Sequence, residues 1–238
     1  MANQNYIDNV ADTIANQVGV LQQEMVRDLL KLSKDRRFKS IDEFLLAIDQ
    51  LDIEQIVRLK AQNIVNGYTA AHTQILADMT LFGEITEDTL RALTNFSTSS
   101  FADSLGKMGG VIKTEIVKGA LGEATEQGIL QAIQQQAGLS NAQMRTLVTT
   151  GLNDYSASVG KIMIDESPKN EKFRYVGAID DKTRPLCIKI WEAGAMTKKE
   201  IKAKFGSEVL VERGGYNCRH QWFPVEASDE SKDVRKDA

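Results

Sequence analysis

Apolar residues recur at helical spacing along the first two thirds of the chain. Between residues 4 and 34 most steps between apolar positions are three or four residues, which predicts one long amphipathic helix. Its apolar stripe consists of Ile7, Val10, Ala11, Ile14, Val18, Leu21, Met25, Leu29 and Leu32. The same spacing predicts further long helices over about 52–79 and from Ser140 to about Glu166, and a short helix after Ser40.

Polar and glycine-rich stretches predict where these helices begin and end. The sequences after Ser40 and Ser140 have the capping-box form, with Glu43 and Gln143 three residues later. Thr86 is expected to begin another helix. Residues 94–100 form a poor helix, and Gly109-Gly110 predicts a break, followed by short helices over about 111–120 and 123–136. Residues 1–166 are therefore predicted to form an α-helical domain.

The pattern changes after about residue 170. Residues 173–179 are aromatic or β-branched at most positions, which predicts a strand, and residues 218–225 predict a second. We expect these strands to pair around two short helices, forming a small α+β domain over 170–226. Residues 227–238 are mixed in charge with almost nothing to bury, which predicts a disordered tail. The fold class is thus mainly α: a multi-helix domain followed by a small α+β domain.

Charge and composition restrict the classes of function. The chain carries 42% hydrophobic and 26% charged residues with a net charge of -4, which is typical of a soluble protein and excludes a general nucleic-acid coat. Residues 1–165 contain 20 acidic against 14 basic side chains, whereas residues 166–238 contain 13 against 15. This asymmetry supports a domain boundary near residues 167–170.

No part of the sequence predicts secretion or a membrane span. The first residues lack a basic and then apolar stretch, and no apolar run approaches the roughly 20 residues that cross a bilayer. Two cysteines in 238 residues are not a disulfide scaffold. We therefore expect a protein made and assembled in a reducing cytoplasm.

Three side chains of metal-ligand type stand near the end of the chain. Cys218 and His220 would point to the same side of an extended segment, and Cys187 would complete a zinc-type set if the fold brings it near. Asp180 or Asp181 is a candidate fourth ligand. Two buried thiols, or a Cys187–Cys218 disulfide formed after lysis, explain the cysteines without a metal, and we favour this simpler interpretation.

Structural roles also compete with chemistry at the polar run before Cys187. Asp180 or Asp181 can cap the helix expected near Pro185, and Arg184 can pair with an aspartate or with a carbonyl near Asn217. The sequence contains no phosphate-binding glycine loop, serine-hydrolase elbow or zinc-protease signature. We therefore favour structural locking over catalysis for this run.

Three further groups of residues receive simple interpretations. His72 is predicted to be a surface or boundary histidine. The basic helical piece that carries Lys198, Lys199, Lys202 and Lys204 could contact DNA phosphates or an acidic protein, although we favour a solvated helix face. Trp191, Trp222 and Phe223 are expected in the core of the small domain.

Two short blocks carry a resemblance to a known family. The first is Asp-x-x-Thr-Arg-x-x-Cys, and the second is Asn-Cys-Arg-His. Their order and spacing resemble the C-terminal domain of the phage minor head proteins, the Mu F-like head morphogenesis family. On that alignment the matching residues are Asp180, Thr183, Arg184, Cys187, Asn217, Cys218 and Arg219. His220 stands where the family usually has a last cysteine. The resemblance covers roughly the last third of the chain.

The resemblance implies a low-copy virion component that acts in head assembly, DNA packaging or DNA delivery. It implies contacts with the portal or the major capsid protein at the inner capsid surface, and in some members with DNA. The protein would reside in the virion, and in the host cytoplasm during assembly, as an oligomer in some assemblies and without membrane contact before delivery. The alternatives are a small metal-dependent hydrolase or nuclease that uses Asp180, Cys187, Cys218 and His220, and an adaptor unrelated to virions.

Overall fold

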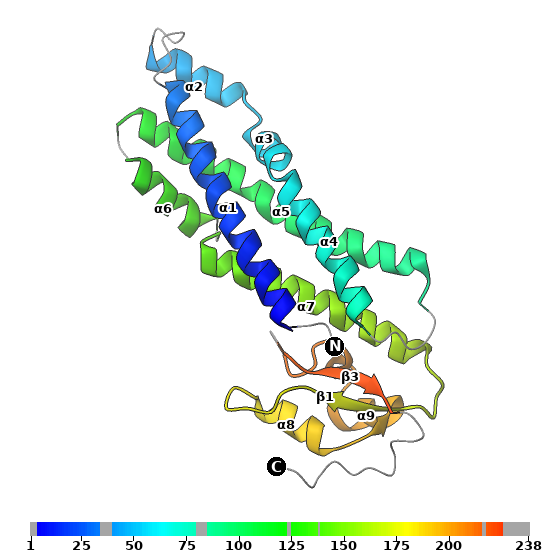
Figure 1. Cartoon of the computed structure of the whole chain (residues 1–238). Helices are drawn as coiled ribbons and strands as arrows, with labels where there is room; N and C mark the ends of the chain where they lie inside the picture. Colours follow the sequence, from blue (N-terminus) through cyan, green and yellow to red (C-terminus); the bar gives the residue numbers. More distant parts are fainter. Residues whose placement is uncertain are drawn as a thin grey trace. The chain divides into compact units, whose positions relative to one another are not determined.

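The computed structural model describes residues 4–33, 40–79, 85–122, 125–137, 139–215 and 218–225. The fold is mainly helical, with a small antiparallel sheet near the C-terminus (Figure 1), which confirms the predicted fold class. The chain divides into two compact units. One contains residues 5–73 and 94–151, and the other contains residues 74–93 and 152–238 with the first four residues.

Long helices with buried apolar stripes build the first unit. Seven of the nine predicted stripe residues of the first helix are buried, from Ile7 to Leu29. Side-chain caps at Ser40, Thr125 and Ser140 begin three of the helices, because each hydroxyl accepts an N–H that has no partner within the helix. The helices, some of which continue into the other unit, are α1 (Gln4–Ser33), α2 (Ile41–Gln50), α3 (Ile53–Lys60), α4 (Gln62–Asp78), α5 (Glu87–Ala120), α6 (Glu126–Gln136) and α7 (Asn141–Glu166).

The predicted break at Gly109-Gly110 is wrong, because α5 runs through it without interruption. A Cβ atom at Gly109 would lie 2.7 Å from the Cα atom of Glu54, so this glycine allows α5 to approach the backbone of α3. Close packing between helices therefore outweighs the low helix propensity of glycine at this point.

The poor helix formers of residues 94–100 also lie within α5. Their hydroxyl groups have partners on α4: Ser97 lies 3.0 Å from the hydroxyl of Tyr68, and Thr98 lies 3.2 Å from that of Thr69. These contacts compensate for weak propensity. The long helix predicted over 52–79 is two helices, α3 and α4, which meet at the buried residue Ala61.

His72 is fully buried, so its predicted surface or boundary position is wrong. Its Nδ1 lies 3.0 Å from the carbonyl oxygen of Tyr68, and its Nε2 lies 3.0 Å from the hydroxyl of Ser97. Because the carbonyl can only accept, Nδ1 carries the proton and Nε2 accepts from Ser97. Both ring nitrogens therefore have protein partners within the helical unit.

The sheet has the strand order β2-β1-β3, with both pairs antiparallel. The predicted pairing of the two motif-bearing segments is confirmed, because β1 (Lys172–Val176) pairs with β3 (Gln221–Pro224) and Tyr175 lies opposite Trp222. The first strand ends at Val176, three residues earlier than predicted. The third strand, β2 (Met196–Thr197), was not predicted, because two residues are too few to show an alternating pattern.

Short helices complete this part of the chain: α8 (Pro185–Glu192) and α9 (Lys198–Phe205), both labelled in Figure 1, and the 3₁₀ turn η1 (Glu208–Leu210). Pro185 occupies the first turn of α8, as predicted. Trp222 is buried and donates its indole N–H to the carbonyl of Val209, 3.2 Å away. Trp191 is 45% exposed and Phe223 is only partly buried, so the predicted three-residue aromatic core is reduced to Trp222.

The core around Trp222 reaches beyond the predicted small domain. Ile164, near the end of α7, belongs to the same buried cluster as Phe173, Tyr175 and Ile190. The boundaries proposed at residues 166 and 170 stay a prediction. Asn217 and the predicted disordered tail lie outside the described residues. No described helix combines the length and the apolarity that crossing a bilayer requires.

Candidate functional site

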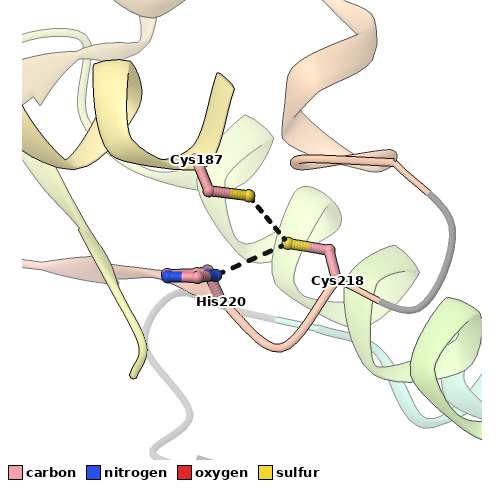
Figure 2. Close-up of side chains that lie close together, drawn as sticks. All are labelled: Cys187, Cys218 and His220. Atoms are coloured by element: carbon pink, nitrogen blue, oxygen red, sulfur yellow. Dashed lines mark hydrogen bonds between the residues drawn. The ribbon is translucent and has the colours of Figure 1, made fainter. Parts of the chain in front are cut away.

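Cys187, Cys218 and His220 come together in the small sheet-containing region (Figure 2), so the fold does bring Cys187 near the other two. The two sulfur atoms are 3.6 Å apart, and Cys218 Sγ lies 3.7 Å from His220 Nδ1. The potential ligand atoms of all three residues lie within 4.8 Å of one another, and all three side chains are buried. Residues separated by more than 30 positions therefore form one compact group.

The local structure explains this convergence. Cys187 lies in the first turn of α8, which follows β1 after a short loop, while Cys218 and His220 lie just before β3. Because β1 and β3 are antiparallel neighbours, the last residue of β1 lies beside the first residue of β3, at the same end of the sheet. The sequence motifs meet because the strands that carry them pair.

Tyr175, in β1, is one of two residues at the site that sequence reasoning missed. Its hydroxyl lies 3.0 Å from Cys218 Sγ and 3.9 Å from Cys187 Sγ, and its ring stacks on that of His220 with centroids 5.1 Å apart. The alternation along β1, which buries Phe173 and Tyr175 on one face, was the available signal. Tyr175 therefore contacts every member of the group.

Two glycines give the group its space. A Cβ atom at Gly214 would overlap Cys187 Sγ and would lie 3.2 Å from Cys218 Sγ. A Cβ atom at Gly177 would press on the ring and backbone of His220. Backbone without side chains therefore packs directly against the sulfur atoms and the imidazole.

The two thiols differ in acidity. Burial would raise the pKa of Cys218, but hydrogen bonds from Tyr175 and from the backbone N–H groups of His220 and Gly214 lower it below its ordinary value. Burial and the neighbouring Cys218 sulfur raise the pKa of Cys187. Burial raises the pKa of Tyr175 far above its usual range, so its hydroxyl remains a donor. Cys218 is consequently the favoured thiolate, with Cys187 and Tyr175 as its donors.

His220 is held as a neutral imidazole. Burial lowers its pKa, and the positive charge of Arg219 lowers it further. Nε2 is buried without a hydrogen-bond partner among the described residues, although the nearby Ala178 carbonyl raises the pKa of the ring somewhat. A neutral imidazole is the form that binds a metal ion.

Asp180 does not cap α8 and does not join the group of ligands, so both of these predictions are wrong. Its carboxylate accepts from Arg219 Nη2 at 2.6 Å and from the backbone N–H of Lys182 at 3.0 Å, and it lies 3.0 Å from the hydroxyl of Thr183. The N-cap of α8 is Arg184, which makes no side-chain cap. Asp181 is exposed and is likewise absent from the group.

Arg184 and Arg213 fix the segment that precedes Cys218. Arg184 Nη1 donates to the carbonyl of Gly214 at 3.1 Å. Of the two predicted partners of Arg184, an aspartate or a carbonyl near Asn217, this bond matches the second. Arg213 is buried with a positive φ of 55° and donates to the carbonyls of His220 and Asn153, at 3.3 and 3.1 Å. Sequence reasoning missed Arg213, because nothing in its local pattern marks a buried cation.

The lysines proposed to contact DNA or a partner have mixed environments. Lys198 donates to the backbone carbonyl of Asp165 at 2.8 Å, and Lys202 lies 3.6 Å from the carboxylate of Asp165. Lys204 lies 5.4 Å from the centre of the Phe205 ring. Lys199 is exposed. Half of this basic face is therefore occupied by contacts with α7.

A pocket of about 150 Å³ opens onto the group. Its lining combines the three candidate ligands with cationic and hydroxyl side chains: Lys182, Thr183, Arg184, Cys187, Cys218, Arg219 and His220. Such a lining can hold a soft metal ion, an anion, or both. Searches of family models, curated proteins and solved structures found no match to this chain.

Proposed function

We propose that this chain is a phage minor head protein of the Mu F-like type, a low-copy virion component. The observation that supports the proposal is that the two blocks carrying the resemblance fold against each other. Asp180 pairs with Arg219, Arg184 bonds to Gly214, and Cys187 contacts Cys218. The residues of the two blocks, which occur together in the resembled family, thus contact one another in this chain.

The helical unit offers surface for protein partners. Three large apolar side chains on its helices are more than 60% exposed: Leu46, Leu59 and Phe96. We propose these side chains as candidate contact points for the portal or the major capsid protein. The acidic helical part would then bind protein, while the more basic C-terminal part would face DNA in the head.

Binding to the portal is the experiment that tests this role. The chain would be co-expressed with the portal and major capsid proteins of its own genome, and complexes would be isolated through the portal. We expect the chain to copurify with the portal, and Phe96→Ser to weaken the association without changing the thermal unfolding temperature. A chain that copurifies with neither head protein would contradict the proposal.

Contact with DNA is tested separately by its dependence on salt. Lys199 is exposed, so Lys199→Gln should weaken DNA binding by the full chain and reduce its salt dependence. Lys198→Gln is the matched control, because Lys198 is already bonded to Asp165. Absence of DNA binding at every salt concentration would confine the proposal to protein contacts.

A metal-dependent hydrolase or nuclease is the second candidate, favoured by the pocket above Cys187, Cys218 and His220. Asp180, the carboxylate expected to take part in this chemistry, is paired with Arg219 instead. An enzyme should lose hydrolysis with His220→Ala under conditions in which the variant is still folded, although removal of this buried, stacked ring also costs stability. Absence of hydrolysis by the unmodified protein would exclude this candidate.

A further inference from the structure

We propose that Cys187, Cys218 and His220 bind one zinc ion, and that its fourth coordination position opens into the pocket lined by Lys182, Thr183, Arg184 and Arg219. This inference concerns the chemistry of the group itself, so it does not depend on the proposed role in the virion. It replaces the simpler interpretation of two buried thiols that the sequence alone favoured.

Two of the three distances between the ligand atoms match those around a tetrahedral ion. With zinc bound at ordinary lengths, two sulfur ligands lie about 3.8 Å apart and a sulfur and a nitrogen about 3.6 Å apart. Here the sulfur atoms of Cys187 and Cys218 are 3.6 Å apart, and Cys218 Sγ and His220 Nδ1 are 3.7 Å apart. The remaining distance, between Cys187 Sγ and the imidazole of His220, is at most 4.8 Å and must shorten when the ion binds.

The surroundings of Cys218 are those of a metal thiolate. Its sulfur is 3.0 Å from the hydroxyl of Tyr175, and the N–H groups of His220 and Gly214 bond to it as well. Donors of this kind orient a ligand and stabilise its negative charge. Because Gly214 has no side chain, its backbone packs directly against the two sulfur atoms. His220 Nδ1 faces Cys218 Sγ (Figure 2), which places its lone pair toward the proposed ion.

A disulfide explains these features less well. A disulfide needs sulfur atoms about 2.0 Å apart, and forming it would leave His220 and the donors around Cys218 without a charged partner. If the two thiols were inert, the orientation of the His220 imidazole toward Cys218 Sγ would have no function. Two sulfurs and one nitrogen at tetrahedral separations select zinc among the common divalent ions.

The fourth position is the distinctive part of the proposal. The side chains above the group are basic or hydroxylic, and no described carboxylate belongs to the group. Zinc sites with three protein ligands keep a position for water or an exogenous ligand. The positive charges of Lys182 and Arg184 favour a small anion or a hydroxide there, whereas the charge of Arg219 is offset by Asp180.

The test uses the full chain purified in the presence of reductant and without chelator. Zinc is measured by elemental analysis, and cobalt is substituted for its absorption spectrum. We expect about one zinc per chain, sulfur-to-cobalt charge-transfer bands, and visible bands typical of tetrahedral cobalt. Added azide should shift the visible bands, because it can occupy the open position.

Variants separate binding from folding. Cys218→Ser should lose at least tenfold in cobalt affinity, while His220→Cys should retain metal, because it exchanges one ligand for another. His72→Gln is the matched control, since His72 is buried but lies far from the group in sequence and has two protein partners. If Cys218→Ser fails to fold, the decision rests on the cobalt spectrum of the unmodified protein.

Three results would overturn the proposal. The first is a metal-free protein that has two titratable thiols and fails to take up added cobalt. The second is a mass two daltons low, which would show that a disulfide persists in freshly reduced protein. The third is a cobalt spectrum without charge-transfer bands from sulfur. A cobalt spectrum insensitive to azide would overturn the open position. Portal binding would be unaffected by these outcomes, so this inference and the proposed function can fail independently.

Discussion

Asp180 and Arg219 form an ion pair, with Oδ1 and Nη2 2.6 Å apart, across 39 positions of sequence. The pair joins the loop after β1 to the segment before β3, just outside the group of Cys187, Cys218 and His220. Thr183 and the backbone N–H of Lys182 complete the partners of the carboxylate. This pair connects the two blocks that resemble the phage family.

Acid should weaken this connection. The hydrogen bond from Arg219 holds the pKa of Asp180 far below its usual range. Its contribution to stability is therefore present above the unfolded-state pKa of about 3.9 and is lost as pH falls toward the folded-state value. Asp180→Asn should lower the urea midpoint at pH 7, and its difference from the unmodified protein should shrink below about pH 4. A difference that stays constant with pH would show that the charge of Asp180 contributes nothing.

The neighbouring glycines Gly109 and Gly110 should respond in opposite ways to alanine. A Cβ at Gly109 would collide with the backbone of Glu54, whereas one at Gly110 would make only an ordinary contact with its side chain. We expect Gly109→Ala to destabilise by about 1–3 kcal/mol. Gly110→Ala should be neutral or stabilise by up to about 1 kcal/mol. Urea unfolding of the two variants checks this, and equal effects would contradict the close approach of α5 to α3.

His72 should make stability depend on pH near neutrality. Burial lowers its pKa below the ordinary value, so the unfolded chain takes up a proton first as pH falls. The contribution of neutral His72 is complete above about pH 6.5 and is lost as pH falls toward its folded-state pKa. His220 adds a slope of the same sign. Between pH 8 and pH 5 the free energy of unfolding of His72→Gln should therefore change less than that of the unmodified protein. The difference between the two changes is the contribution of His72.

Removing the hydroxyl of Tyr175 should weaken the site without abolishing it. Tyr175→Phe keeps the ring that stacks on His220 but removes the donor to Cys218. We expect a loss of about 1 kcal/mol in the free energy of unfolding, and a shift of the charge-transfer bands in the cobalt-substituted protein. Unchanged bands would mean that the hydroxyl does not bond to the metal-bound sulfur.

The sequence predicted the parts of the fold that depend on periodicity. The stripe of α1, the caps at Ser40 and Ser140, and the pairing of β1 with β3 followed from spacing and from local hydrogen bonding. It did not predict that α5 is continuous through Gly109, because the compensating contact is made by Glu54, 55 positions away. Tertiary packing decided what propensity could not.

The site shows the same division. The closeness of Cys218 and His220 was predicted, since they share one side of an extended segment, whereas the approach of Cys187 depended on the pairing of the two strands. The partner of Asp180 was not, because two arginines stand near the second block and local sequence does not distinguish them. Tyr175 was treated only as a strand former, and its contact with the sulfurs depends on the register between β1 and β3.

The amount of this chain in purified virus particles tests the proposed function most directly. Particles carrying the genome that encodes it would be purified, and the chain would be quantified by mass spectrometry relative to the portal protein. The proposal predicts a constant low copy number that survives washing at high salt. Particles that lack the chain, while it accumulates in the infected cell, would contradict the proposed role as a head component.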